Sequence, residues 1–187
     1  ARLAVLRSFL KFAAHRDVAS LQVIERALGV PVKRFERPLF GYLSREEMLA
    51  VIGTPDDSWL SQRDHVLFLL MYNTGARVSE ATQLKMRDLQ IGRGNGGHDL
   101  ATLHGKGGKT RQCPLWPETE RVLADEILGR SGDDAVFVSR LGTPFTRFGV
   151  YRLIERYAAR VPELADRTIT PHVIRHTTAV HLLRAGV

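Results

Sequence analysis

The stretch HGKGGKT at residues 104–110 combines glycines, two lysines and a threonine, which are residue types that bind phosphate groups. A nucleotide-binding P-loop needs a glycine five positions before its Gly-Lys pair. Counted from Gly108 that position is Leu103, and counted from Gly105 it is Leu100, so the spacing excludes a P-loop. The lysines therefore lie on a glycine-rich turn, which is either a solvated tip or a mobile tip that brings a donor into a shared site.

Arg77 stands in the stretch TGARVSE, directly after an apolar run and a glycine. This context places its guanidinium near the interior, where a charge must be paired. Two interpretations remain open. Arg77 forms an internal ion pair with Glu80 at helical spacing, or it faces a functional site.

His172 and Arg175 in PHVIRH are three residues apart, so they share one face of a helix near its N-terminus. Free amides and the helix dipole favour an anion there. A zinc site through His172 and His176 is a rival interpretation, but Val173 replaces the glutamate of a His-Glu-x-x-His motif and no third ligand is evident. His176 and His181 also fit hydrogen-bonded structural histidines.

Together these side chains could surround one phosphodiester. Arg77 and Arg175 would neutralise a pentacoordinate phosphate through paired hydrogen bonds. Lys106 would protonate a leaving 5′-oxygen, and His172 would transfer a proton or donate a hydrogen bond.

The elements that position these residues are predicted to be mainly helices. Apolar periodicity and N-terminal signals predict helices at about 3–16, 20–28, from the capping box Ser44–Glu47 onward, 65–72, 76–85, 117–128, after Thr146, and from Thr170 to Gly186. Short alternating runs predict strands at 88–91, 100–104 and 110–115, with a tight hairpin turn at 105–108. The expected fold class is α+β, mainly α-helical with a small three-stranded antiparallel sheet.

The charge balance limits the possible partners. An excess of 27 Lys+Arg over 20 Asp+Glu gives +7 and a pI near 10.1, which favours nucleic acid, although a merely basic soluble protein is the alternative. The single cysteine, Cys113, excludes an internal disulfide framework and fits a reducing cytoplasm. The apolar run at 66–71 is too short to span a bilayer, and no signal segment opens the chain.

Prolines and clustered charge at 29–38, without helical period, predict an extended linker and a domain boundary. The helices before it would be the end of an N-terminal domain. Because residue 1 is Ala and the sequence stops one residue past Gly186, we expect a piece of a longer protein.

The three motifs, in this order, resemble the tyrosine recombinases, or phage integrase family, from about Tyr42 to the end. The resemblance implies residues 1–36 as the C-terminal part of a helical, SAM-like core-binding domain with its linker, and 37–187 as an incomplete catalytic domain. It implies strand cleavage and rejoining through a 3′-phosphotyrosyl link, without metal or nucleotide, on double-stranded DNA by tetramers. The catalytic set would be Arg77, Lys106, His172 and Arg175, and expected DNA contacts are Lys109, Arg111, Lys11 and Arg7.

One departure from the family pattern concerns the nucleophile. The family's tyrosine follows the last helix of this chain, whereas Tyr42, Tyr72, Tyr151 and Tyr157 all precede Arg175. We therefore expect residues 1–187 to bind DNA without cleaving it. The alternatives are a non-catalytic DNA-binding or regulatory remnant of the family, and a helical basic transcription factor.

Overall fold

The computed structural model describes residues 2–31, 41–55, 58–92, 99–130 and 132–187. The chain divides into two compact units, Ala1–Leu39 and Phe40–Val187. Most of the predicted linker at 29–38 lies outside the described residues. Its first three residues, Gly29, Val30 and Pro31, are described, and Gly29 is the last residue of a helix.

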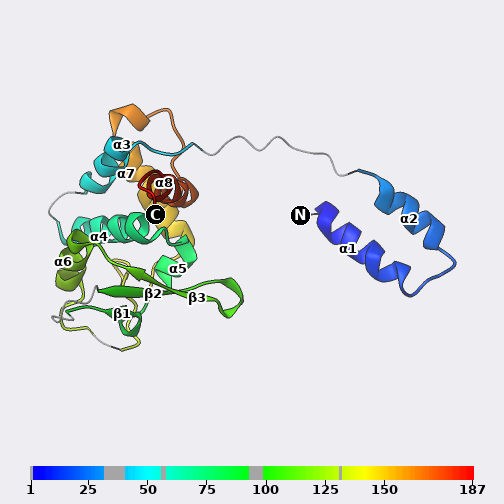
Figure 1. Ribbon diagram of the computed structural model, residues 1–187, viewed down its shortest axis with the longest axis horizontal. Coiled ribbons are helices and arrows are strands. Elements are labelled where there is room, and N and C mark those ends of the chain that lie inside the picture. The colour runs from blue at the N-terminus through cyan, green and yellow to red at the C-terminus, as the bar shows by residue number, and fades with distance from the viewer. Residues whose placement is uncertain (1, 32–40, 56–57, 93–98, 131) are drawn as a thin grey trace. The chain divides into compact units, whose positions relative to one another are not determined.

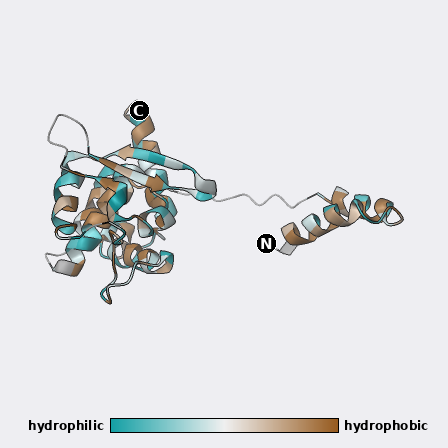
Figure 2. Ribbon diagram, turned by 90° about the horizontal axis from the view of Figure 1, so that it is seen from below, coloured by the Kyte–Doolittle hydropathy of each residue, from teal (hydrophilic) through white to brown (hydrophobic). Residues whose placement is uncertain are grey.

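The first unit is a pair of helices, α1 (Arg2–Ala14) and α2 (Leu21–Gly29), that pack against each other (Figure 1). Arg7 joins them. Its guanidinium donates to the backbone carbonyls of Leu28 at 2.8 Å and Val30 at 3.0 Å, which satisfies acceptors at the C-terminal end of α2. Apolar side chains of α1 such as Phe9 remain exposed in this unit, and hydrophobic segments of the helix are brown in Figure 2.

The second unit is built around α4 (Trp59–Thr74), whose residues 66–72 are all buried. The helices that pack against it include α3 (Arg45–Gly53), α6 (Pro117–Glu126) and α8 (Pro171–Arg184). The remaining helices are α5 (Val78–Thr82) and α7 (Arg147–Ala158), with short 3-10 turns η1 (Met86–Asp88), η2 (Lys106–Gly108) and η3 (Pro162–Leu164). No helix among the described residues is long and apolar enough to cross a membrane.

Side chains at the predicted N-termini cap their helices as expected. Ser44 and Glu47 form a reciprocal capping box, with Ser44 N–H to Glu47 Oε2 at 2.7 Å and Glu47 N–H to Ser44 Oγ at 3.1 Å. Thr146 caps α7 through the N–H of Gly149, and Thr170 caps α8. The residues that begin these three helices were therefore predicted correctly.

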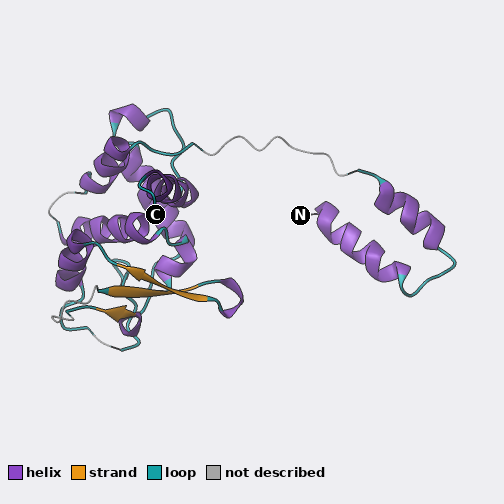
Figure 3. Ribbon diagram, in the orientation of Figure 1, coloured by secondary structure: helices purple, strands orange, loops and turns teal. Residues whose placement is uncertain are grey.

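The sheet is antiparallel in the order β1 (Leu89–Gln90), β2 (Leu100–His104), β3 (Thr110–Pro114), as Figure 3 shows in orange. Ala101 and Leu103 of β2 are buried, in alternation with more exposed neighbours. The fold class expected from the sequence is confirmed. β1 is shorter than predicted because Asp88 belongs to η1.

Candidate active site

A break after α4 brings Arg77 and Arg175 to the same place. Gly75 has a left-handed backbone with φ of 57°, which ends α4, and Arg77 then stands at the N-cap of α5. Helix α8 packs on this break, because a Cβ on Gly75 would lie 3.4 Å from Thr178 Cγ2. One turn away on α8, the Arg175 guanidinium donates to the carbonyl of Gly75.

Glu80 ties two guanidiniums together from α5. Its Oε1 accepts from Arg77 Nη1 at 2.8 Å. Its Oε2 accepts from Arg111 Nη2 at 2.8 Å and from the backbone N–H of Arg77 at 2.9 Å. The Glu80 side chain is only 2% exposed, whereas those of Arg77 and Arg111 are 51% and 36% exposed. The carboxylate thus lies beneath two arginines that reach solvent. The ion pair that the sequence left as one interpretation of Arg77 is present.

The electrostatics of the cluster follow from this arrangement. Burial raises the pKa of Glu80, but hydrogen bonds from Arg111 and Arg77 outweigh burial and bring that pKa to about 2. The bond to Glu80 raises the pKa of Arg111. Burial lowers the pKa of Arg175, and the positive charges of Arg77 and Arg111 lower it further. Three guanidiniums therefore lie close enough to repel one another, which makes the place attractive for an anion.

The β2–β3 hairpin carries its lysines to this cluster. A hollow of about 620 Å³ is lined by Arg77, Arg111, Lys106 and Lys109, with Gly105, Gly107 and Thr110. Both lysines are exposed. The connection is longer than the tight turn predicted at 105–108, because the strands pair only as far as His104 and Thr110 and leave a loop of residues 105–109.

The histidines divide between two settings. His172 is an exposed residue in the first turn of α8, one turn before Arg175, and His176 is exposed as well. His181 is a hydrogen-bonded structural histidine as predicted, since its Nδ1 lies 2.8 Å from the hydroxyl of Tyr72. In the part of the chain that the structure describes, no three His, Cys, Asp or Glu side chains gather closely enough to hold a metal ion, so the zinc interpretation finds no third ligand there.

The remaining expected DNA contacts lie in two places. Lys109 belongs to the hairpin loop, and Arg111 is paired with Glu80. Lys11 is exposed on α1, whereas Arg7 is used to cap α2. The pairing of Arg111 is the feature that sequence reasoning missed. The alternation of β3 could have indicated only that Arg111 lies on the same half-buried face as Cys113, without naming its partner.

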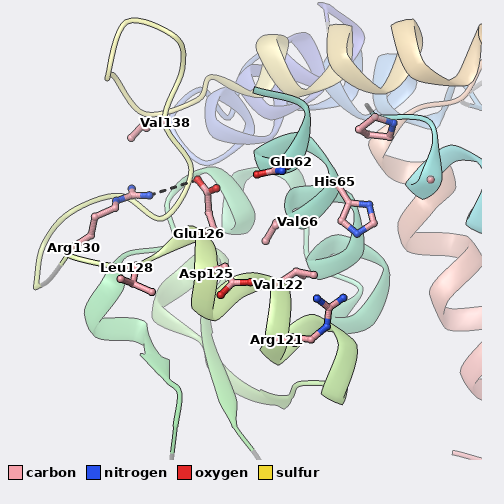
Figure 4. A pocket seen from close by; sticks show the side chains of 12 residues that line it. Gln62, His65, Val66, Arg121, Val122, Asp125, Glu126, Leu128, Arg130 and Val138 are labelled. Atoms are coloured by element: carbon pink, nitrogen blue, oxygen red, sulfur yellow. Dashed lines mark ion pairs between the residues drawn. The ribbon is translucent and has the colours of Figure 1, made fainter. Parts of the chain in front are cut away.

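A second hollow, of about 720 Å³, lies apart from these residues between α4 and α6 (Figure 4). His65 and Gln62 come from α4, and Glu126 from α6. Burial raises the pKa of Glu126, whose Oε1 is 3.8 Å from Arg130 Nη1. None of the predicted site residues lines this hollow.

The model of the phage integrase family matches residues 41–187, which include the arginine cluster, the hairpin and α8. The chain belongs to this family. Its relatives include the putative integrase/recombinase y4rC of Sinorhizobium fredii, 36% identical over 100% of this chain and 57% of the relative. Another is the tyrosine recombinase XerD of Ralstonia nicotianae, 38% identical over 77% of this chain and 47% of the relative. This phage integrase family member spans 57% to 65% of the length of the first curated relatives it matches.

Solved structures share the fold of this family member. The XerA recombinase matches with a TM-score of 0.68 at 23% identity, covering 100% of this chain and 69% of that one. A lambda integrase dimer bound to a COC′ core site matches with a TM-score of 0.63 at 18% identity, covering 94% and 64%. The chain is thus a tyrosine recombinase family member by sequence, and the helical unit with its small sheet is the fold of these recombinases.

Proposed function

We propose that residues 1–187 form the DNA-binding and phosphate-holding part of a site-specific tyrosine recombinase or integrase. The observation that carries this proposal is the convergence of Arg77, Arg111 and Arg175 beside the lysine-bearing hairpin, in a member of the phage integrase family. On this proposal residues 1–36 belong to a core-binding domain and residues 37–187 to the catalytic domain. The substrate is double-stranded DNA in the cytoplasm, and the complete protein works as a tetramer.

The proposed chemistry uses four groups of this chain. Arg77 and Arg175 hold the non-bridging oxygens of the scissile phosphate and offset the charge that builds up during attack. A tyrosine hydroxyl gives up its proton, which His172 can accept, and its oxygen forms the new bond to phosphorus, while the 5′-oxygen leaves with the electron pair of the broken bond. Lys106 gives that oxygen its proton, which yields a 5′-hydroxyl, and His172 assists as a hydrogen-bond donor or proton carrier.

The nucleophile is proposed to come from outside residues 1–187, because all four tyrosines of this sequence precede Arg175 and three of them bind other side chains. Tyr72 is 7% exposed, bonded to His181, and burial raises its pKa, which disfavours the phenolate. Tyr157 is 2% exposed and donates to Asp64 at 3.0 Å. The hydroxyl of Tyr42 accepts from Arg184 at 2.6 Å.

The test is a covalent-trapping assay. Duplexes that bind residues 1–187 are first selected from a random library, and the selected sequence is then placed in nicked suicide substrates. The complete protein should form a denaturation-resistant complex with such a substrate, while residues 1–187 alone should bind it without covalent attachment.

Arg77→Ala and Arg175→Ala should each slow trapping by about 100-fold or more, the size seen when one stabilising donor is lost. Arg152→Ala is the matched control, since Arg152 is an exposed arginine of α7 outside the cluster. Binding without trapping by the complete protein would favour the non-catalytic, regulatory interpretation. Failure to select any DNA would overturn the proposal.

A further inference from the structure

Both ends of the hairpin loop at 105–109 meet at Glu80. On the β3 side, Arg111 follows the loop by two residues and binds Glu80 Oε2 at 2.8 Å. On the β2 side, a Cβ on Gly105 would lie 3.3 Å from Glu80 Oε1 and 3.9 Å from Arg77 Nη1. The loop itself is closed by the N–H of Gly105, which donates to the carbonyl of Lys109 at 2.7 Å. The base of the hairpin is thus attached to the carboxylate that also holds Arg77.

The tip of the hairpin has few constraints of its own. Gly107 and Gly108 have φ of 76° and 73°, a backbone region that glycine enters freely. Lys106 and Lys109 are exposed. Within the tip the backbone forms the short turn η2 and the bond between Gly105 and Lys109, so the place of the Lys106 ammonium relative to Arg77 depends on how the base of the hairpin is attached.

Arg111 is poorly suited to a simple contact with the DNA backbone. Its guanidinium is bound to a carboxylate that is 2% exposed, and a phosphate could take it fully only by leaving that carboxylate without one of its partners. An unpaired buried charge is costly. The same carboxylate accepts from the N–H and the guanidinium of Arg77, so Arg77 keeps its own contacts with Glu80 when Arg111 is replaced.

We propose that Arg111 is a positioning residue, which fixes the Lys106 hairpin against Arg77 through the carboxylate of Glu80. This inference rests on the proposed function of the same site. Loss of Arg111 would leave the phosphate contacts of Arg77 and Arg175 in place but would release the hairpin. The step that suffers is then protonation of the leaving 5′-oxygen, rather than binding of DNA.

A substrate with sulfur in place of the bridging 5′-oxygen tests this directly. A thiol has a pKa of about 8.5, so a 5′-thiolate leaves without a proton from a general acid. Arg111→Gln in the complete protein should slow covalent trapping on the oxygen substrate by about 10-fold or more, within the range of a general acid's contribution. On the sulfur substrate the defect should disappear, as it should for Lys106→Ala.

Two control variants separate the possible causes. Arg77→Ala should remain slow on both substrates, because a phosphate contact is needed for either leaving group. Arg111→Lys should recover part of the rate on the oxygen substrate, since an ammonium can still bind one oxygen of Glu80. Equal loss on both substrates would overturn the positioning role, and so would weakened DNA binding with a normal trapping rate, the result expected of a backbone contact.

A second measurement keeps this inference distinct from the proposed function. Hydrogen exchange of the amides at 105–109 can be followed in residues 1–187 without any cleavage. Arg111→Gln should accelerate that exchange by about 10-fold or more if the bond to Glu80 holds the hairpin. If the wild-type protein traps no substrate, the proposed function is wrong, but the exchange measurement still tests the role of Arg111. Unchanged exchange would overturn the role of Arg111 even in an active recombinase.

Discussion

Replacing Glu80 by glutamine should destabilise the second unit strongly at neutral pH and much less in acid. The substitution keeps the shape of the side chain and removes its charge. Arg77 and Arg111 would then face Arg175 without the carboxylate that offsets their repulsion. The fold would retain three guanidiniums at one place and lose the anion that binds two of them.

The magnitude follows from the pKa of Glu80, which lies at about 2 instead of the ordinary 4.5. Each pKa unit corresponds to 1.36 kcal/mol, so the ionised carboxylate stabilises the folded state by about 3 kcal/mol relative to its protonated form. Because the folded pKa is the lower one, this stabilisation is complete well above pH 4.5 and is lost as the pH falls toward 2. Glu80→Gln should therefore cost about 3 kcal/mol at pH 7.

Urea unfolding followed by tryptophan fluorescence measures this loss of unfolding free energy. The signal reports on the second unit, since both tryptophans, Trp59 and Trp116, belong to residues 40–187. Wild type and variant are compared at pH 7, 4 and 3, so that other carboxylates titrate equally in both. Glu163→Gln, a change at an exposed glutamate of η3, is the matched control and should shift the midpoint little at any pH. Equal stability of wild type and Glu80→Gln at pH 7, or a gap that does not narrow toward pH 3, would refute the reasoning.

Three further changes test other parts of the fold. Asp64→Asn should lower the unfolding free energy by about 3 kcal/mol or more in urea unfolding, because Arg63, 4% exposed, loses its charge partner; a loss below about 1 kcal/mol would count against the buried pair. Thr170→Ala should lower it by about 1 kcal/mol through loss of the α8 cap, and Thr170→Ser should restore most of that. Arg7→Met should speed hydrogen exchange in the last turn of α2 without changing exchange in residues 40–187. If Arg7 only contacts DNA, exchange in α2 should stay unchanged.

Local signals in the sequence were sufficient for most helix starts and for the sheet. Ser44, Thr146 and Thr170 each accept a hydrogen bond from the backbone N–H three residues ahead, and that interaction depends only on near neighbours. Alternation in residues 100–104 was equally local. Such elements can be predicted from the sequence because the residues that favour them lie within a few positions of one another.

Interactions of charged side chains explain where the predicted helix boundaries were wrong. Helix α4 begins six residues before its predicted start of 65, because Arg63 and Asp64 neutralise each other and are buried as a pair. In an analysis of apolar periodicity, two adjacent charged residues indicate exposed positions, so these two were not predicted to lie in a buried helix. Helix α5 begins later than the predicted residue 76 because Glu80 accepts a hydrogen bond from the N–H of Arg77, which makes Arg77 the cap instead of an interior residue.

The same limit applies to the candidate site. The motifs indicated Arg77, Lys106 and Arg175, but no local pattern states that Arg111, 31 residues from Glu80, shares its carboxylate. Only the register of β2 with β3 and the packing of α5 against β2 bring these residues together.

The break at Gly75 explains how Arg175 can be half-buried beside two other arginines. Helix α4 ends there, and its last carbonyls need donors. Thr178 of α8 donates to the carbonyl of Tyr72 at 2.8 Å, and Arg175, three residues earlier on the same face, donates to that of Gly75. The negative end of the α4 dipole thus compensates a guanidinium that lacks a carboxylate contact among the described residues. Because a carbonyl takes only part of its hydrogen-bonding capacity, Arg175 keeps donors for a further acceptor, whereas the charges of Arg77 and Arg111 are already shared with Glu80. The helix end therefore holds Arg175 in place without neutralising it, and this supports the proposal that Arg175 binds a phosphate oxygen.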